Sequence, residues 1–423
     1  MYDVERRPCA AIALLFLCIA MCGTPCSAAT HVVDHAGNGD FATIQEGIDA
    51  ATYGDTVLVK AGIYHETPHV GPSADGVSLV SESGPELTIV TADSLYPRSV
   101  LTCEGVGPAT VIRGFTFRAG YTNEPGGGIQ CTDAGVSIEG NIIRDNWSLY
   151  EGGGVSLWLC HARLEDNLII SNRATDGGGV SVTGGVVTIQ RNTLADNIAS
   201  GLGGTQFGGG ILIVAGEHDV SWNTIAGNYS SVAGGGILMS SVDACDVHDN
   251  VIRENEAPTG GGLYLRNTTA EIRGNVVAAN SSSSRGAAVF CRDLSAPYSS
   301  PVFTDNILHN NTCVSGGAVA VNDGPSPVFN SNFFVNRASA FELVVGASDA
   351  SLVLDFTGNW WGTADSAAIA ELIWDCEDDS AVEPCVDVSG WCIDPSCSGQ
   401  ATSVQTPEGT TESSWGRIKS LYR

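Results

Sequence analysis

Two short segments of this sequence combine an aromatic residue with an arginine two positions later. Tyr264 is followed by Arg266, and Phe290 is followed by Arg292. Aromatic rings bind the apolar faces of sugars, and guanidinium groups pair with the carboxylates of uronic acids. The segments form one ligand-binding patch, together with Asp293, only if the fold places residues 26 positions apart side by side. The alternative is that these residues bind no ligand and belong to a side of the fold that the following loop or the C-terminal tail covers.

Paired carboxylates on neighbouring coils would be a different kind of site, because two acids side by side can catalyse glycoside hydrolysis. Asp166, Asp249 and Asp305 each stand directly before an asparagine of a repeating pattern. In the units between them, other residue types take this position: Arg191, Trp222 and Gly274. We therefore expect no two of these acids to be neighbours, and the acid pair of a glycosidase is not predicted. Both lysines of the chain lie outside the repeats, which excludes a lysine base there.

These residues belong to a sequence repeat, whose fold determines which of them are neighbours. Glycine clusters begin at Gly126, Gly152, Gly177, Gly208, Gly234 and Gly260, with weaker versions at Gly286 and Gly316. About fifteen residues after each cluster comes an asparagine, and in the first seven units a second one follows five positions later. The first asparagines of these seven units are Asn141, Asn167, Asn192, Asn223, Asn250, Asn275 and Asn306. A period of this size predicts a stacked array.

Inside each unit, apolar residues alternate with polar ones, which indicates strands with one buried face. Three short strands and three turns in about 27 residues describe one coil of a parallel β-helix. We predict that the asparagines adopt the left-handed backbone that such turns need. Their amides are expected to hydrogen-bond along the axis as a ladder. Cys131 and Cys291 fall in one inward column, so we expect both to be buried and unpaired.

The Gly-Gly-Gly-Ile clusters and the Asn-x-Ile-x-x-Asn pattern resemble those of right-handed parallel β-helix proteins of the pectin-lyase-like type. The most similar members are secreted repeat proteins related to polymorphic outer-membrane proteins. The resemblance covers about residues 30–395. It implies an all-β fold consisting of a single right-handed parallel β-helix, with a helical N-terminal cap and a cysteine-rich C-terminal cap.

The resemblance does not imply one activity, because the fold carries lyases, hydrolases, esterases and adhesins. Lyase members use calcium-binding carboxylates with an arginine or lysine base. Polygalacturonase-like members use clustered aspartates with Gly-His-Gly and Arg-Ile-Lys. This sequence has no Gly-His-Gly, and its Arg417-Ile418-Lys419 lies in the tail outside the coils. A polygalacturonase-like mechanism is therefore not expected.

The two ends of the chain differ from the repeats. Residues 1–28 resemble a signal peptide, with Arg6-Arg7 before an apolar run and small residues at the end. Residues 29–397 are expected to form the β-helix with its caps, and 126–340 are predicted to be its core repeats. Thr43 to Glu46 predicts a capping box and a short helix, followed by a first strand over 55–64. Residues 398–423 are expected to form a flexible linker and a basic tail.

Residues 360–397 are expected to close the last coil. The two tryptophans Trp360 and Trp361 are predicted to plug it, and a short helix with Asp365 or Ser366 as N-cap follows. Four clustered cysteines in an exported chain predict two disulfides with open pairing: Cys376, Cys385, Cys392 and Cys397. The acids at 375–379 could attract calcium, but their spacing matches no calcium-binding loop. No metal centre or cofactor is predicted.

Charge narrows the range of partners. Lys and Arg number 19 against 47 acids, which gives a net charge of -28. Such a surface disfavours nucleic acids and anionic membranes as partners but is compatible with neutral glycans. The apolar run near the N-terminus is too short for a membrane span.

Taken together, these features predict an exported, surface-associated scaffold that binds glycans or mediates adhesion. One alternative is a polysaccharide lyase or hydrolase that uses Arg266 or Arg292. The other is a purely structural envelope protein.

Overall fold

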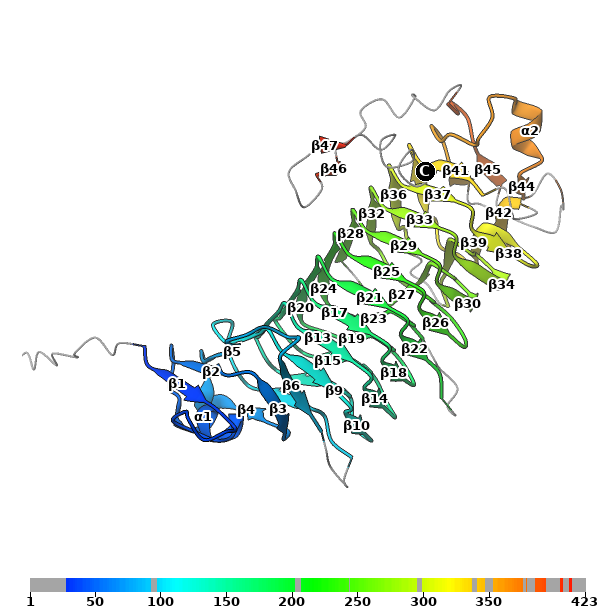
Figure 1. Cartoon of the computed structure of the whole chain (residues 1–423). Coiled ribbons are helices and arrows are strands. Elements are labelled where there is room, and N and C mark those ends of the chain that lie inside the picture. Colours follow the sequence, from blue (N-terminus) through cyan, green and yellow to red (C-terminus); the bar gives the residue numbers. More distant parts are fainter. Residues whose placement is uncertain are drawn as a thin grey trace, which may run out of the picture.

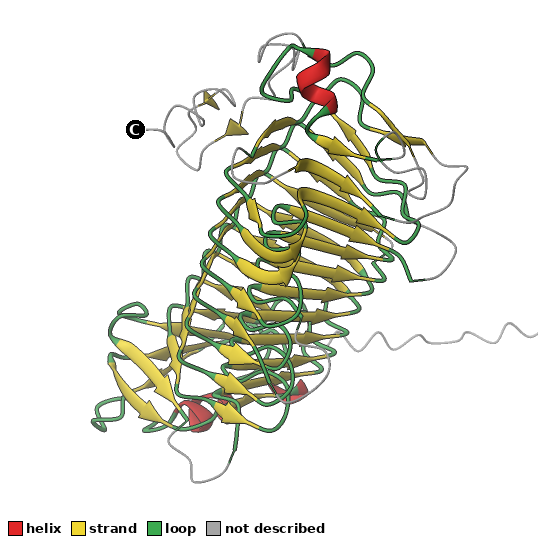
Figure 2. Cartoon of the chain, turned by 90° about the vertical axis from the view of Figure 1, so that its right-hand side faces the viewer, coloured by secondary structure: helices red, strands yellow, loops and turns green. Residues whose placement is uncertain are grey.

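The computed structural model describes residues 28–92, 97–201, 207–242, 244–294, 299–336, 341–346, 353–375, 378 and 385–392, and the backbone of two short strands near the C-terminus. Within them the chain winds into an elongated stack of coils (Figure 1). Figure 2 shows the strands of successive coils lying parallel to one another, with helices near the two ends of the stack.

Four parallel sheets run along the stack, and each central coil contributes one strand to each sheet. Sheet A extends from β1 (Thr30–Val33) to β40 (Val328–Asn330), sheet B from β3 (Gly62–His65) to β41 (Phe333–Val335), sheet C from β4 (His69–Val70) to β44 (Ile373–Trp374), and sheet D from β10 (Tyr121–Thr122) to β38 (Thr312–Cys313). The predicted all-β class and single parallel β-helix are confirmed.

Two central coils illustrate the winding. One coil consists of β23 (Ile211–Val214), β24 (Glu217–Ser221), β25 (Thr224–Ala226) and β26 (Tyr229–Ser230). The next consists of β27 (Ile237–Ser240), β28 (Ala244–His248), β29 (Val251–Arg253) and β30 (Glu256–Thr259). Paired strands lie about 4.8 Å apart, so residues one repeat apart are neighbours on a common face. Inward residues such as Ile211, Ile237 and Val247 are fully buried.

The glycine clusters allow the coils to approach closely where sheet D turns into sheet C. A Cβ at Gly209 would lie 2.5 Å from the carbonyl oxygen of Gly235 and 2.6 Å from that of Tyr229. Carbon atoms do not approach backbone oxygen this closely, so a larger residue would separate the coils. The clusters therefore serve the architecture.

The asparagines form two buried ladders along the stack. In the first ladder, the backbone N–H and the Nδ2 of Asn192 donate to Oδ1 of Asn223 at 2.9 and 3.1 Å. The Nδ2 of Asn223 donates in turn to Oδ1 of Asn250 at 3.0 Å. The second ladder, which includes Asn197 and Asn228, repeats this pattern.

The backbone at these turns differs from the prediction. In the central coils, the residue before the ladder asparagine carries the left-handed conformation, for example Trp222 (φ 59) and Asp249 (φ 55). The asparagine is not free to take it, because its amide must point inward to bond with the neighbouring coils. The corner is therefore made by the preceding residue, whatever its type.

The N-terminal end contains the predicted helix, α1 (Ile44–Ala50), which begins with the predicted capping box of Thr43 and Glu46. The predicted first strand was wrong in position. β1 precedes α1 and pairs with β2 (Thr56–Val59), whereas the chain from Gly62 onward belongs to sheet B as β3. The four residues of β1 are too few for an alternating pattern to identify.

At the C-terminal end, α2 (Ser366–Ala370) begins at the predicted N-cap Asp365. Trp361 is 2% exposed, and its ring stacks on Phe334 at 4.6 Å. Cys385 lies in β45 (Cys385–Asp387) and Cys392 is buried. Cys376 and Cys397 lie outside the described residues, so the disulfide pairing stays a prediction.

Other predictions have mixed outcomes. Cys131 and Cys291 are buried and free, as expected. In 398–423, only the backbones of β46 (Val404–Gln405) and β47 (Thr411–Glu412) are described, and the signal peptide lies outside the described residues apart from residue 28. No helix of the described part has the length and apolar character of a membrane span.

Candidate functional site

The predicted aromatic and arginine patch lies on sheet C, in β31 (Leu263–Arg266) and β35 (Val289–Arg292). The register places Tyr264 beside Phe290 and Arg266 beside Arg292. The two rings stack with their centroids 5.1 Å apart. The predicted neighbourhood of these four residues is therefore present.

The rings of this patch are not an open platform. Tyr264 is 6% exposed and Phe290 3% exposed, in an apolar cluster with Leu212 and Leu238 that Phe207 also contacts. Burial also raises the pKa of Tyr264 above its usual value, although the nearby arginines oppose this shift. This geometry favours the covered flank over the open patch.

The charged members of the patch are engaged with other protein groups. Arg266 donates to the hydroxyl of Ser240 at 2.8 and 3.0 Å, and the Nε of Arg292 lies 2.7 Å from the carboxylate of Asp323. Asp293 is 1% exposed and accepts hydrogen bonds from the Asn267 N–H and the Ser299 hydroxyl. The ligand-binding role of the patch stays a prediction.

Sheet D carries an exposed column that the sequence analysis missed. Its members lie in β10, β14 (Trp147–Ser148), β18 (Arg173–Ala174), β22 (Ile198–Ala199) and β26. The column consists of Tyr121, Trp147, Arg173, Ile198 and Tyr229, which pair in register from coil to coil. We call these five residues the sheet D column. Its two best exposed rings are Tyr121 at 42% and Trp147 at 41%.

Contacts between neighbours order part of this column. The rings of Tyr121 and Trp147 meet edge to face with centroids 5.2 Å apart. The guanidinium of Arg173 lies 5.2 Å from the centre of the Trp147 ring, as in a cation–π contact. Each strand of sheet D in this region has two residues, of which the second is buried and the first points outward. The position directly after the second asparagine of each unit was the sequence signal for this column.

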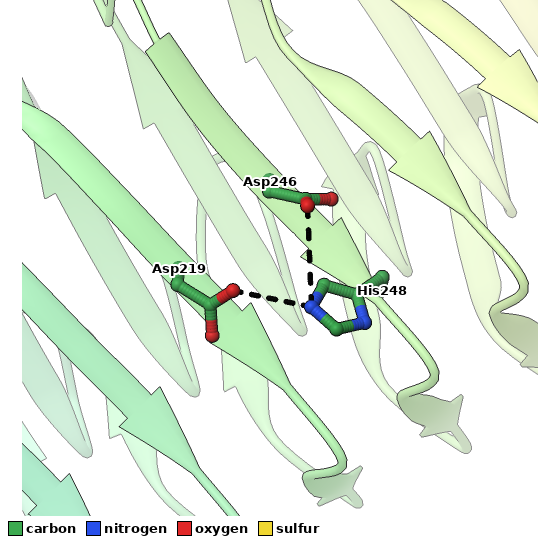
Figure 3. A group of neighbouring side chains, drawn as sticks. All are labelled: Asp219, Asp246 and His248. Carbon is green, nitrogen blue, oxygen red and sulfur yellow. Dashed lines mark hydrogen bonds and ion pairs between the residues drawn. The ribbon is translucent and has the colours of Figure 1, made fainter. Parts of the chain in front are cut away.

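Sheet A carries a second group of outward side chains, shown in Figure 3. Asp219 of β24 pairs directly with Asp246 of β28, and Ser221 pairs with His248. The Nε2 of His248 lies 3.1 Å from the carboxylate of Asp219 and 4.0 Å from that of Asp246. The Nδ1 of His248 lies 2.8 Å from Oδ2 of Asp249. We call Asp219, Asp246 and His248 the sheet A cluster.

The carboxylates around His248 control its protonation. Hydrogen bonds to Asp219 and then to Asp249 raise the pKa of His248 to about 9. Burial alone would raise the pKa of Asp219, but the hydrogen bonds from His248 and Ser221 leave it below the usual value. In the absence of other cations, His248 is an imidazolium between two carboxylates.

A pocket of about 410 Å³ adjoins the cluster. Asp246 belongs to both, and Glu217 and Glu271 add two more carboxylates to the pocket wall. His218 also lines the pocket and is 7% exposed. Its Nε2 lies 2.7 Å from the Ala215 carbonyl, and its Nδ1 has no hydrogen-bond partner within the described residues. Burial lowers the pKa of His218, so Nδ1 offers an unpaired lone pair.

The acids directly before the asparagines, Asp166, Asp249 and Asp305, lie on separate coils. Two acids of another column are neighbours, and the sequence analysis did not consider that column. The outward positions of sheet A lie two and four residues before the asparagine, because side chains alternate along a strand. At the fourth position, Asp219, Asp246 and Glu271 occupy three successive coils.

Comparison with known proteins gives a partial match at the level of fold. The model of the family described as "Right handed beta helix region" matches residues 178–357. The crystal structure of a Dettilon tailspike protein is similar over 76% of this chain and 67% of that chain, with 11% identity and a TM-score of 0.40. Pectin methylesterase from carrot is similar over 93% of this chain and 96% of that chain, with 14% identity and a TM-score of 0.27. At TM-scores this low, neither likeness bears on function. No curated protein matches significantly.

Proposed function

We propose, on the premise that this chain is a right-handed parallel β-helix protein, that it is an exported scaffold that binds neutral polysaccharide along sheet D. The observation that carries this proposal is the sheet D column, with its exposed rings on successive coils. Export is inferred from the signal-peptide pattern of residues 1–28.

The side chains of the column suit a sugar polymer. Exposed tyrosine and tryptophan rings present apolar faces beside a polar atom, which is the combination that binds sugar rings. Arg173 adds hydrogen-bond donors next to Trp147. Because the column runs along the axis of the stack, an extended polymer can contact several coils at once.

Charge selects the class of polymer. The chain carries a net charge of -28, and Arg173 is the one cation of the column. A polyanion such as polygalacturonate would meet repulsion from the protein as a whole. A neutral polysaccharide meets none, so it is the expected ligand.

The test is affinity electrophoresis through gels that contain a neutral glucan, mannan or xylan, with polygalacturonate and alginate gels for comparison. We expect wild type to be retarded by at least one neutral polymer. Trp147→Ala should weaken retention about tenfold, because an aromatic contact contributes about 0.5–1.5 kcal/mol beyond its buried area and about 1.4 kcal/mol is a factor of ten. Tyr121→Ala should have a smaller effect in the same direction.

Trp158→Ala is the matched control. Trp158 is 52% exposed at the end of β15 (Val155–Trp158) in sheet C, away from the column. It should leave retention unchanged. If Trp158→Ala weakens retention as much as Trp147→Ala, or if no neutral polymer retards wild type, the proposal fails. The lyase alternative would instead release unsaturated sugars from polygalacturonate or alginate in the presence of Ca²⁺, which absorbance detects.

A further inference from the structure

We propose that the sheet A cluster binds one divalent transition-metal ion, with Zn²⁺ as the ion that its donors suit best. The three donor atoms of Asp219, Asp246 and His248 all lie within 4.8 Å of one another. Ligands of one tetrahedral zinc lie about 3.4 Å apart, given zinc bonds of about 2.0–2.2 Å. Small side-chain rotations therefore suffice to bring all three onto one ion.

His248 is already oriented as a metal ligand. Its Nδ1 lies 2.8 Å from Oδ2 of Asp249, and its Nε2 faces the two other carboxylates. A carboxylate on the outer nitrogen of a metal-bound histidine fixes the ring and its tautomer. Asp249 occupies that position, so it is inferred to be a positioning residue.

Asp219 and Asp246 face each other directly on adjacent strands, where like charges are destabilising unless a cation lies between them. A protonated His248 would be such a cation, but an ion-pair network of this kind leaves Oδ1 of Asp246 buried without a hydrogen-bond partner in the described part of the chain. Arg273 binds the other oxygen of Asp246 at 2.6 Å. The three carboxylates of Asp219, Asp246 and Asp249 are balanced by Arg273 and one divalent cation, with His248 neutral.

The adjoining pocket gives this cluster room for a further ligand. Asp246 is part of its wall, so an ion on this carboxylate lies beside an open space that can hold a water molecule or another fourth ligand. Sites with three protein ligands and one open position are typical of zinc that binds water or substrate.

The donor set separates zinc from calcium. One imidazole nitrogen and two carboxylates match zinc and its neighbours in the first transition series. Calcium takes six to eight oxygen ligands, which these residues do not supply. The proposal therefore departs from the sequence-based prediction of no metal centre, which the titration below tests.

The experiment is calorimetric titration of the full chain, produced without a histidine tag and stripped with EDTA, using ZnCl₂ alone. We expect one Zn²⁺ per chain. CoCl₂ should give the strong visible absorption of four-coordinate cobalt. His248→Gln and Asp219→Asn should each weaken zinc binding more than about 100-fold, since loss of an outer-shell partner alone costs about 10–100-fold. Asp249→Asn should weaken it about tenfold.

Glu254→Gln is the matched control. Glu254 follows β29, its carboxylate lies 2.8 Å from Arg253, and it belongs neither to the cluster nor to the pocket wall. It should bind zinc as wild type does, which separates a built site from general attraction to an acidic surface. Circular dichroism verifies the fold of each variant, and if His248→Gln does not fold, Asp219→Asn decides.

The proposal is overturned if wild type binds no stoichiometric zinc. Equal affinity in wild type and Asp219→Asn overturns it as well, and so does calcium binding that zinc does not displace. Glycan retention in the Trp147→Ala test is independent of these results, because the sheet D column lies on another sheet.

Discussion

Asp55 shows how a single carboxylate fixes the beginning of the stack. It is 4% exposed and accepts hydrogen bonds from the N–H of Ala29 at 2.6 Å and from the N–H and hydroxyl of Thr52 at 2.8 Å each. These bonds, led by that from Ala29, lower the pKa of Asp55 well below its usual value. The ionised form of Asp55 is therefore part of the native structure.

This arrangement predicts a pH-dependent cost for Asp55→Asn. A depressed native pKa contributes stability that is fully present above the unfolded-state pKa of about 4, and that is lost as pH falls through the native pKa. The variant should therefore have a lower urea midpoint than wild type at about pH 7, and the difference should shrink below about pH 4. A difference that stays constant between about pH 7 and about pH 3 would contradict this role of the charge.

At the residue scale, the sequence correctly predicted which side chains lie side by side, but not whether those side chains are exposed to solvent. The repeat spacing correctly placed Tyr264 beside Phe290. It did not show that Leu212, Leu238 and Phe207 pack around these rings, because an outward position becomes buried when segments of other coils fold over it. The sheet A cluster was missed for a simpler reason, since its paired acids occupy a different column of the repeat from the one directly before the asparagines.

At the scale of elements, the asparagine ladder joins the turns of successive coils. Asn223 is 1% exposed. Its Oδ1 accepts two hydrogen bonds from Asn192, and its Nδ2 donates to the carbonyl of Ile189 and to Asn250. All these groups are buried, so water cannot replace a lost partner.

Asn223→Ala should destabilise the coil stack by about 3 kcal/mol or more, because each buried group left without a partner costs about 1–3 kcal/mol. Urea unfolding followed by circular dichroism measures this loss. Thr224→Ala changes the next residue, whose side chain points outward, and should cost no more than about 0.5 kcal/mol. Similar midpoints for the two variants would show that the ladder contributes little.

Local sequence signals predicted the two helices but not the shortest strands. The capping box of Thr43 and the N-cap Asp365 identified α1 and α2, because a cap is a short-range hydrogen bond between residues close in sequence. β1 was missed because its four residues gain their order by pairing with β2 beyond an intervening helix. The two-residue strands of sheet D also lack a pattern of their own, and only the alignment of coils reveals them.

At the scale of the whole molecule, one period determines both architecture and surface. The spacing of glycines and asparagines predicted the coil stack, since every unit must bury the same face against its neighbours. It also distributes side chains into columns along the axis. The sheet D column and the sheet A cluster occupy different sheets of the same stack, so the scaffold can present two chemistries independently.

The end of the stack gives the last prediction. Each coil of a solenoid contacts only its neighbours, so damage to one end should remain local. Trp361 is 2% exposed and stacks on Phe334, whose N–H donates to the carbonyl of Trp360. Trp361→Ala should cost about 3–5 kcal/mol, the usual range for a buried aromatic side chain.

Hydrogen exchange with mass spectrometry should localise this loss. Amides of β41, which contains Phe334, should exchange faster in Trp361→Ala, while those of β11 (Ile129–Thr132) should keep their wild-type protection. Trp158→Ala, which removes an exposed tryptophan, should leave both strands unchanged. Faster exchange in β11 as well would mean that the coils unfold as one cooperative unit, contrary to the nearest-neighbour behaviour expected of stacked repeats.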